Sequence, residues 1–574
     1  MKHLLPYFSP YKWRMLQGLL IKIVGTAGEL LLPMILTYML ESVIATRNMG
    51  RVIFFGALML VISIAIWLFN VKANRMAAKV ASQIAEDVRR DLFEKTLYLS
   101  ARSTDRFTIP SLESRITSDT YNFHHFINMV QRMGVRAPIL LIGGVAIAFV
   151  IDYALALVMV ATLPFIFVIV YFVTRRGVPI YNKVHKSVDE MVRVVREDSQ
   201  GIRVIKALSK EDYENRRFSE RNDTLSNTER KAGIIMGIPA PVMTLLMNLG
   251  ICGVIIVSAY RVGENLSSPA SVIAFMQYFT LVSMAMMTLS RVLVAYTKCS
   301  VSSRRIAEVL NTVDEFPVIP DENIEKGDTV PHVAFKNVSF SYLGKKENLK
   351  NINFSLQKGD TLGIIGATGS GKSTLIKLLM RFYDVNEGEI SINGRGVASY
   401  TRDELTSMFG VVLQNDFLFA DTVCENIKFG REISDEDMIW AAKTAQAHEF
   451  IIEKEDNYSY LLTTGGTNLS GGQRQRLLIS RALASRPDIL ILDDSSSALD
   501  YKTDATLRAA LRAELSDTTV ITVAQRVSSV MYSDLIIVLD EGEIIGIGSH
   551  DELLASCPEY KEISDSQMGG AFVE

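Results

Sequence analysis

The distribution of apolar residues divides the chain into two parts. Six long apolar stretches lie within about the first 300 residues, near 15–40, 52–72, 134–151, 154–174, 234–260 and 271–298. Because a helix of about 20 apolar residues crosses a bilayer, each stretch predicts a membrane-spanning helix. Only Asp152 and Tyr153 separate the third stretch from the fourth, which predicts a very tight turn there.

The connections between these stretches differ in length and charge. Residues 73–133 and 175–233 are long, charged and helix-favouring, whereas the other turns, 45–51 and 261–270, are short. Residues 174–232 contain fourteen Lys and Arg residues, and the short turns contain three. Because positive charge favours the cytoplasmic side, the long connections and both chain ends are predicted to be cytoplasmic.

The composition changes after Thr312. Residues 313–332 are polar, contain three prolines and show no periodicity, which is typical of a linker. Beyond them strand-like runs alternate with helices, as in Thr361–Ile365 followed by Gly371–Phe382, and this alternation indicates an α/β domain. The sequence therefore predicts an all-α six-helix transmembrane domain over 1–310, a linker over 311–330 and an α/β domain over 331–574.

The overall composition agrees with two joined parts of different character. Hydrophobic residues make up 48% of the chain and its mean hydropathy is +0.20, yet 21% of the residues are charged. The net charge of −3 gives no indication of a nucleic-acid partner. The four cysteines are scattered without a CxxC pair, so a reducing compartment is predicted and neither a disulfide nor a metal site is expected. No cleavable signal peptide is expected either.

A glycine-rich segment follows the apolar run at 361–365. It reads Gly366, Ala367, Thr368, Gly369, Ser370, Gly371, Lys372, Ser373 and Thr374, and it opens an apolar helix. In this context the pattern is typical of a loop whose N–H groups wrap the phosphates of a nucleotide. Lys372 would neutralise the β- and γ-phosphates of ATP, and the Ser373 hydroxyl would ligate Mg²⁺. The flanking strand and helix argue against the alternative, an ordinary glycine-rich turn.

A second apolar run ends in a carboxylate. Asp493 directly follows Ile489–Leu492, which reads as a buried strand. In phosphate-loop ATPases an aspartate at this strand end holds Mg²⁺. Taken alone the signal is weak, because many strands end in Asp before a turn.

The motif that decides between families of nucleotide-binding proteins lies twenty residues before Asp493, and it reads Leu469, Ser470, Gly471, Gly472 and Gln473. With it the whole chain resembles the ATP-binding-cassette (ABC) family, and its bacterial multidrug and lipid exporters in particular. The resemblance implies that the second domain is an α/β P-loop ATP-binding cassette, and that two cassettes bind head to tail. Ser470 and Gly472 would then contact an ATP held by the partner, a second ABC half-transporter.

The same resemblance implies roles for further residues. Tyr342 would stack on adenine, and Gln414 would touch Mg²⁺ and sense the membrane domain. Ser497–Asp500 matches the loop that follows the Mg²⁺ aspartate. The cytoplasmic connections would carry short coupling helices near 107–114 and 209–218 that dock on the cassettes. Solvated helix surface is the alternative interpretation of these charged stretches.

Two positions depart from the family pattern. Asp494 stands where hydrolysing members have the glutamate that polarises the attacking water, and its carboxylate is withdrawn by about 1.5 Å because one methylene is missing. Gln525 stands where the family has a histidine that contacts the γ-phosphate; an amide donates a hydrogen bond but cannot become cationic. Both changes affect one chemical step, so a site that binds ATP and hydrolyses it slowly is predicted. Harmless drift at each position is the alternative.

The intact signature leads to a prediction about assembly. A partner with the usual Glu and His would hydrolyse ATP against residues 469–473, which predicts a heterodimer with one degenerate and one competent site. The resemblance implies ATP-driven alternating access in the cell membrane. A homodimeric lipid or drug flippase and, from another class, a nucleotide-gated channel or a regulatory subunit remain alternatives. Six spans exclude a soluble family member, and the fused ATPase part disfavours an importer.

The substrate is the feature that the sequence indicates least clearly; a hydrophobic or amphipathic drug, lipid or peptide is expected. Lys22 and Glu29 share one face of the first helix, and they either line the cavity or pair with each other or with a neighbouring helix. Arg132 and Arg136 either do the same or lie at the cytoplasmic membrane edge. Five methionines either form an adaptable apolar surface or face lipid and pack between helices: Met243, Met247, Met284, Met286 and Met287.

Overall fold

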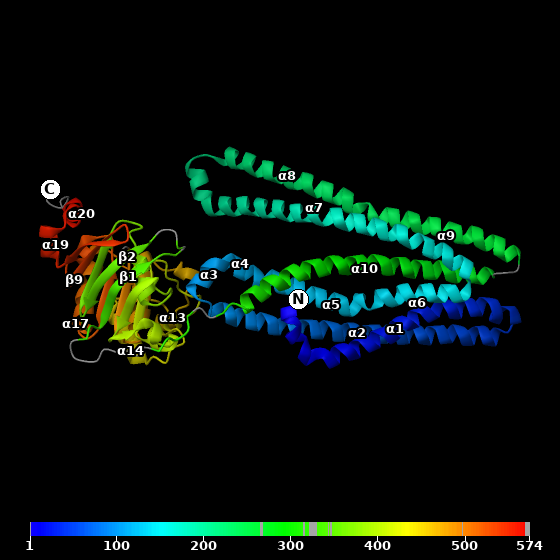
Figure 1. Ribbon diagram of the computed structural model, residues 1–574, viewed down its shortest axis with the longest axis horizontal. Helices are drawn as coiled ribbons and strands as arrows, with labels where there is room; N and C mark the ends of the chain where they lie inside the picture. Colours follow the sequence, from blue (N-terminus) through cyan, green and yellow to red (C-terminus); the bar gives the residue numbers. More distant parts are fainter. Residues whose placement is uncertain are drawn as a thin grey trace. The chain divides into compact units, whose positions relative to one another are not determined.

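The computed structural model describes residues 2–264, 268–313, 316–320, 330–342, 344, 347–495 and 498–568. The chain divides into two compact units, which are described separately (Figure 1). The helical unit comprises Met1–Tyr98 and Phe107–Thr312, and the α/β unit comprises Leu99–Arg106 and Val313–Glu574. Of the linker predicted at 311–330, residues 314–315 and 321–329 lie outside the described residues.

Long helices build the helical unit. A 3₁₀ segment, Lys2–Tyr11, precedes α1 (Lys12–Tyr38), α2 (Met49–Leu97), α4 (Ile109–Ser114), α5 (Thr120–Met129), α6 (Arg136–Ile151), α7 (Tyr153–Ala207), α8 (Glu211–Gly237), α9 (Pro239–Gly263) and α10 (Pro269–Leu310). Two π-helical turns, Arg115–Asp119 and Val130–Gly134, join α4, α5 and α6 into one nearly continuous rod. Figure 1 shows α7 running back beside α8 and α9, while α1 lies along α2.

Within the described residues, five helical segments are long and apolar enough to cross a membrane: Leu4–Thr46, Met49–Leu97, Ile109–Ile151, Pro241–Gly263 and Pro269–Leu310. They contain the predicted spans 15–40, 52–72, 134–151 and 271–298 in full, and Pro241–Gly263 contains the fifth, 234–260, from residue 241 onwards. The fourth predicted span, 154–174, begins α7, and its described apolar part is the shorter Tyr153–Ile169. The apolar pattern did not predict the full length of α2 and α7, because their extensions are polar.

The predicted tight turn is present, since Asp152 alone separates α6 from α7. Its carboxylate accepts hydrogen bonds from the N–H groups of Ala154 (2.9 Å) and Leu155 (3.3 Å), and so caps the first turn of α7. The second carboxylate oxygen accepts a hydrogen bond from Arg261 Nε at 3.1 Å. This ion pair ties the turn to the end of α9.

Small residues let the helices of this unit approach closely. A Cβ added to Gly250 of α9 would overlap the ring of Phe279 on α10, and one added to Gly144 of α6 would lie 2.8 Å from a methyl group of Val282. Phe279 and Val282 are both buried. Van der Waals contact of this kind holds helices together in lipid, where burial of apolar surface gives no advantage.

Of the two regions predicted to carry short coupling helices, near 107–114 and 209–218, only the first contains a short helix. The first region contains α4 and is preceded by α3 (Ala101–Phe107), most of which belongs to the α/β unit. There the hydroxyl of Tyr383 donates a hydrogen bond to Asp105. The second region is not a separate short helix, because α8 runs on unbroken from Glu211. Its acidic first turn favours a helix start, and Gly233 is its first glycine.

Two sheets form the centre of the α/β unit. The antiparallel sheet has the order β2 (Leu349–Leu356), β1 (Val333–Phe340), β4 (Glu387–Ile392) and β5 (Arg395–Gly396). The second sheet has the order β10 (Glu543–Gly548), β9 (Leu535–Asp540), β3 (Thr361–Gly366), β8 (Thr519–Val523), β7 (Ile489–Asp493) and β6 (Phe409–Val412). From β9 to β6 its strands are parallel, whereas β10 is antiparallel. The carboxyl ends of the parallel strands therefore meet at one edge.

The helices of this unit after β3 are α11 (Lys372–Leu379), α12 (Arg402–Ser407), α13 (Val423–Lys428), α14 (Asp435–Thr444), α15 (His448–Ile452), α16 (Gly471–Leu483), α17 (Tyr501–Glu514), α18 (Val527–Val530), α19 (His550–Ser556) and α20 (Pro558–Met568). One buried cluster joins the two sheets and α11, with Val338, Ile364 and Leu375 among its members. The predicted α/β fold is thus confirmed, with α11 fixed against the sheet at the loop that precedes it.

Candidate nucleotide-binding site

Three neighbouring strands bring the predicted site residues together. β3 leads into the glycine-rich loop, β7 ends at Asp493, and β8 leads to Gln525. β8 lies between the other two strands and is parallel to both, with Ile364 and Asp493 each opposite Val523. Because parallel strands end at the same edge, residues more than a hundred positions apart in the sequence line one cavity.

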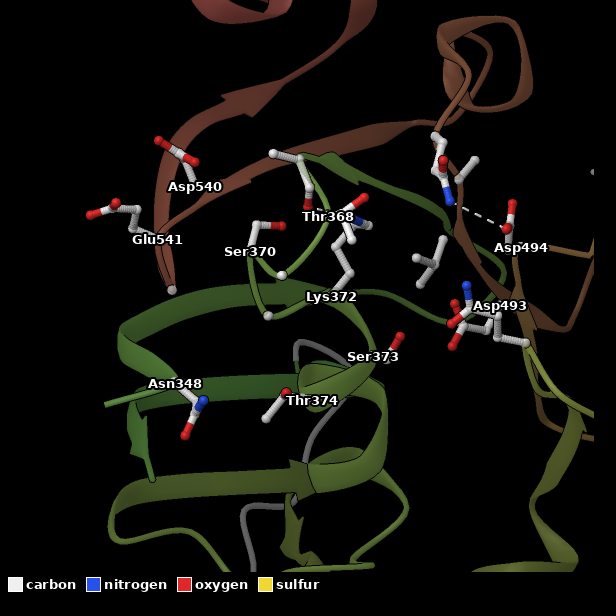
Figure 2. Close-up of a pocket in the computed structure, with 18 of the residues that line it drawn as sticks. Asn348, Thr368, Ser370, Lys372, Ser373, Thr374, Asp493, Asp494, Asp540 and Glu541 are labelled. Atoms are coloured by element: carbon white, nitrogen blue, oxygen red, sulfur yellow. Dashed lines mark hydrogen bonds between the residues drawn. The ribbon is translucent and has the colours of Figure 1, made fainter. Parts of the chain in front are cut away.

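The cavity at this edge has a volume of about 580 Å³, a size that suits a small ligand (Figure 2). Its predicted lining residues are Thr368, Gly369, Ser370, Gly371, Lys372, Ser373, Thr374, Gln414, Asp493, Asp494 and Gln525. The sequence did not predict the other lining residues, which are Glu347, Asn348, Ala367, Val523, Ala524, Asp540, Glu541 and Gly542. Figure 2 shows Lys372 between two acidic sides of the cavity, one formed by Asp540 and Glu541 and one by Asp493 and Asp494.

Backbone geometry explains two glycines of the loop. Gly366 has a φ of +157°, and a Cβ there would overlap the carbonyl oxygen of Leu539 on β9. Gly371 has a φ of +107°, and a Cβ there would lie 2.7 Å from a methyl group of Leu349 on β2. Only glycine fits both requirements. α11 begins directly after Gly371, so the helix end that attracts phosphate lines the cavity.

Two donors in the loop are placed to receive phosphate. The Lys372 Nζ donates hydrogen bonds to the carbonyl oxygens of Gly366 and Ala367, both at 2.8 Å. Burial lowers the pKa of Lys372, while the carboxylates of Asp493 and Asp494 act in the opposite direction. The Ser370 Oγ is buried, and it has no hydrogen-bond partner in the described part of the chain. A phosphate oxygen would supply the acceptor that this hydroxyl lacks.

Three oxygen donors line the same cavity: the Ser373 hydroxyl, the Gln414 amide and the Asp493 carboxylate. Asp493 is 5% exposed, and burial raises its pKa, whereas a hydrogen bond from Ser373 lowers it. Hard oxygen donors such as these suit Mg²⁺, and a cation beside Asp493 would offset the cost of burying its charge. The residues present therefore fit the metal that the sequence predicts.

The two departures from the family pattern are in contact. Gln525 Nε2 donates a hydrogen bond to Asp494 Oδ2 at 3.4 Å, drawn as a dashed line in Figure 2. Asp494 has a φ of +53°, and its N–H donates to the carbonyl oxygen of Val523 at 2.9 Å. Burial raises the pKa of Asp494, while Lys372 and Arg526 act to lower it. The two side chains that differ from the family pattern therefore lie together at one place in the cavity lining.

Gln475 on α16 holds the backbone on both sides of this position. Its Nε2 donates to the carbonyl oxygen of Asp494 at 3.2 Å, and its Oε1 accepts from the N–H of Ala498 at 3.2 Å. Sequence reasoning missed this residue because its partners lie nineteen and twenty-three positions away. No local pattern distinguishes Gln475 from its polar neighbours Gln473, Arg474 and Arg476 on α16.

The signature residues form the start of α16, away from the cavity. Ser470 Oγ accepts from the N–H of Gln473 at 3.2 Å, and Gln473 Oε1 accepts from the N–H of Ser470 at 3.1 Å. This capping box leaves Ser470 and Gly471 exposed. The described residues that line the cavity do not include Leu469–Gln473. The signature thus presents an exposed, capped helix end that does not line the cavity.

Asp500 has a structural role that the resemblance did not predict. It caps α17 by accepting hydrogen bonds from the N–H (2.9 Å) and the hydroxyl (2.8 Å) of Thr503, and these bonds lower its pKa. Ser497, at the start of the predicted loop, lies outside the described residues. The match of Ser497–Asp500 to the loop that follows the Mg²⁺ aspartate remains a prediction.

Tyr342 lies beside the cavity. Its ring packs edge-on against Phe340 and Tyr383, with ring centroids 4.9 and 5.0 Å away. Its hydroxyl donates a hydrogen bond to Thr374 at 3.3 Å, which links it to α11. The described lining of the cavity does not include Tyr342, so its stacking on adenine remains a prediction.

The contacts and burial of charged residues and methionines in the helical unit decide between interpretations that the sequence left open. Glu29 pairs with Arg136 of α6 at 2.8 Å, so its ion pair is with a neighbouring helix. Met243 and Met286 are buried together in one cluster, which supports packing between helices. Met284 is exposed, as is Met287.

Comparisons with known proteins agree along the whole chain. The model of the ABC transporter transmembrane region matches residues 15–286, and the ABC transporter model matches 349–497. An uncharacterized ABC transporter ATP-binding protein of Mycobacterium tuberculosis H37Rv is 32% identical over 572 residues, 99% of this chain and 98% of that protein. One from Bacillus subtilis 168 is 32% identical over 571 residues, 99% of each. The solved structure of a bacterial Atm1-family ABC exporter with ATP bound shares the fold, with a TM-score of 0.82 and 24% identity over 98% of this chain and 99% of that one.

Proposed function

The chain belongs to the ABC transporter family, and from that premise we propose that it is the degenerate-site subunit of a heterodimeric exporter. The family relation gives a membrane protein with an ATP-binding and ATP-hydrolysing cassette that works as a dimer. The proposed cargo is a hydrophobic or amphipathic compound such as a drug, lipid or peptide. The fold shared with a bacterial exporter supports export as the direction. The contact between Asp494 and Gln525 supports the degenerate site.

That contact bears on the hydrolytic step. A glutamate at 494 would carry its carboxylate about 1.5 Å further into the cavity, where the attacking water must be polarised. Positioning errors of about 1 Å already cost on the order of a hundredfold in rate. In this chain the Asp494 carboxylate also accepts a hydrogen bond from Gln525, and that amide cannot supply the positive charge that a histidine offers to the γ-phosphate.

Binding of ATP is retained in the proposal. Lys372, Ser370 and the start of α11 would hold the phosphates, since each offers donors at the cavity. Ser373, Gln414 and Asp493 would hold Mg²⁺, which supplies charge neutralisation of the phosphate oxygens when bound. ATP would thus stay in this site longer than in a competent one.

The intact signature supports a second, competent site made with a partner. Ser470 and Gly471 are exposed at a capped helix end, where N–H groups and a hydroxyl are available to a γ-phosphate held by another cassette. A partner with Glu and His in place of Asp494 and Gln525 would hydrolyse ATP there. The heterodimer follows from this asymmetry.

Coupling to transport would use the cytoplasmic connections. In the proposal ATP binding closes two cassettes, Leu99–Arg106 carries the motion to the membrane helices, and the cavity opens outward. The hydrogen bond from Tyr383 to Asp105 within the α/β unit supports this role for the segment. Both chain ends and the ATP-binding domain would be cytoplasmic, and we retain the predicted domain boundaries of 1–310 and 331–574.

The test measures ATP hydrolysis by the purified chain alone and with the second cassette chain that accompanies it from its native membrane. The chain alone should bind ATP but hydrolyse it at least about tenfold more slowly than the pair. Asp494→Glu with Gln525→His should raise the rate of the chain alone by about tenfold or more. Asp493→Asn provides the inactive control.

The contrary result is equally definite. If the chain alone hydrolyses ATP as fast as any pair, and the double substitution adds nothing, the degenerate site is refuted and a homodimer is left. A passive flux that follows only the substrate gradient would instead indicate a nucleotide-gated channel.

A further inference from the structure

A chain of polar contacts crosses three helices in the apolar part of the helical unit. Lys22 of α1 is only 4% exposed, and its Nζ donates to Oδ1 of Asn70 (2.7 Å) and of Asn74 (3.2 Å) on α2. Asn70 Nδ2 donates to Glu29 Oε1 of α1 at 3.1 Å. The other oxygen of Glu29 accepts from Nε (3.1 Å) and Nη2 (2.8 Å) of Arg136 on α6. We call these five residues the polar network.

On the segment that leads to Arg136, three side chains have buried polar atoms that lack a partner among the described residues. Arg132 Nε, Gln131 Nε2 and Asn128 Oδ1 make no hydrogen bond to any residue that the structure describes. Arg132 lies close enough to act electrostatically on Lys22. Arg132 and Gln131 stand on the π-helical turn Val130–Gly134, a kind of turn that often marks functional sites. Two of the three atoms, Arg132 Nε and Gln131 Nε2, are donors, whereas Asn128 Oδ1 is an acceptor. Unsatisfied donors are costly in a membrane, so a ligand that accepts from the first two would be stabilising.

The charges of this region do not balance. Lys22, Arg132 and Arg136 are cations, and Glu29 is the one carboxylate within the polar network. Charges within a membrane normally pair or face a water-filled cavity. The region is open on one side, because 46% of the Arg136 side chain is exposed. The excess positive charge therefore favours an anionic ligand that enters from that side.

Helix geometry gives the depth of the region. Arg136 lies fifteen residues before the end of α6 at Ile151, which is roughly 22 Å along the axis. Asn70 lies twenty-one residues after the start of α2 at Met49, or roughly 32 Å. The hydrocarbon core is about 30 Å thick. If the short turns face outward, as the proposed function requires, the polar network lies in the inner half of the bilayer, where head groups of inner-leaflet amphiphiles are within reach.

We infer that the polar network and Arg132 bind the anionic head group, phosphate or carboxylate, of an acyl-chain amphiphile taken from the inner leaflet. The planar guanidinium of Arg132 matches two oxygens of such a group, and Gln131 adds an amide donor. Glu29 holds Arg136 in place. This inference rests on the proposed function for the membrane orientation and for transport, but binding itself requires neither ATP nor hydrolysis.

The test uses the full chain with its co-purifying partner in dodecyl maltoside, and it follows the thermal unfolding midpoint. Dodecyl phosphate should raise the midpoint, whereas dodecyltrimethylammonium and inorganic phosphate at equal concentration should not. Arg132→Gln should weaken the affinity for dodecyl phosphate by about tenfold to a hundredfold. Arg132→Lys should recover part of it. Arg51→Gln, which removes a cation at the start of α2 outside the polar network, should bind normally.

A purely structural role for Arg132 gives the opposite pattern. Since Arg132 Nε has no partner within the described chain, Arg132→Gln should leave the midpoint without ligand unchanged or higher; a lower midpoint with unchanged affinity would overturn the inference. Equal stabilisation by the cationic amphiphile would also overturn it, as would equal stabilisation by inorganic phosphate, which would indicate a soluble anion. No ATPase rate enters this test, so its failure is distinguishable from failure of the degenerate-site proposal.

Discussion

The nucleotide cavity and the signature surface belong to one cassette, but they differ in what has changed. In the cavity the phosphate loop is kept, while Asp494 and Gln525 replace the residues of the hydrolytic step. On the signature surface Leu469–Gln473 matches the family pattern throughout. In the proposed heterodimer the cavity would hold this chain's own ATP, and the signature would contact an ATP held by a partner. Under that proposal the two surfaces complete different sites, so a change in one does not require a change in the other.

Damage to each of the two surfaces separately, in the proposed heterodimer, should have the strongest consequences. Gly472→Arg places a long side chain at the signature, where even a Cβ would lie 3.2 Å from the Ala498 carbonyl oxygen. Complex ATPase activity should fall about a hundredfold, the scale for loss of transition-state donors. Lys372→Ala should abolish ATP binding in this chain's cavity and lower the ATPase activity by less than about tenfold. Activity assays with bound-nucleotide counts measure both.

If Lys372→Ala proves as damaging as Gly472→Arg, the two surfaces do not serve unequal sites and the comparison fails. Ser485→Ala, an exchange away from both surfaces, is the matched control and should leave the activity of the complex unchanged.

Lowering the pH is expected to have an effect of intermediate size on the affinity for Mg²⁺–ATP. Burial raises the pKa of Asp493, so this carboxyl takes up a proton at higher pH than an ordinary aspartate, and the protonated form cannot hold Mg²⁺. Affinity for Mg²⁺–ATP in the cavity should therefore fall as the pH is lowered, and the fall should begin at a higher pH than an ordinary aspartate would give. Hydrogen bonds lower the pKa of Asp500, so the stability that its ionised form gives α17 is lost only at lower pH.

Nucleotide titrations, together with circular dichroism over the same pH range, distinguish the two carboxylates. Asp493→Asn removes the titrating group, so its weak affinity should not change over this range. The same pH dependence in the unmodified chain and in Asp493→Asn would show that protonation of Asp493 does not govern metal binding.

The smallest effect is expected next to the signature surface, at the cap of α17. Asp500→Ala removes the acceptor of the Thr503 bonds and should lower the free energy of unfolding of the α/β unit, as the loss of a helix cap does. Asp500→Asn keeps a good cap and should change it little. Denaturant unfolding measures both variants. If both retain full ATPase activity in the complex, Asp500 acts only as a helix cap.

Sequence patterns predicted the features that depend on neighbours in the chain. The glycine-rich loop, the strand before Asp493 and the turn at Asp152 all follow from local runs of residues, and the structure has each of them. The signature could also be identified from the sequence, because its five residues are consecutive. Its capping box lies within the same segment, Ser470–Gln473.

Contacts between distant residues were not predictable in the same way. Gln525 and Asp494 are thirty-one positions apart, and their contact depends on the pairing of β7 with β8. Glu541 lines the cavity because β9 ends beside the loop, which no local pattern reveals. The seven-residue spacing of Lys22 and Glu29 placed them on one face, but it did not reveal that Asn70 of another helix separates them.

Gln475 links the signature helix to the backbone beside the nucleotide cavity by hydrogen bonds. It stands one turn into the helix that starts at the signature, and it grips the backbone of Asp494 and Ala498. In the proposed heterodimer, a shift of the signature helix would therefore be transmitted through Gln475 to the strand end of this chain's own cavity. The same linkage would couple the nucleotide bound in one proposed site to the geometry of the other.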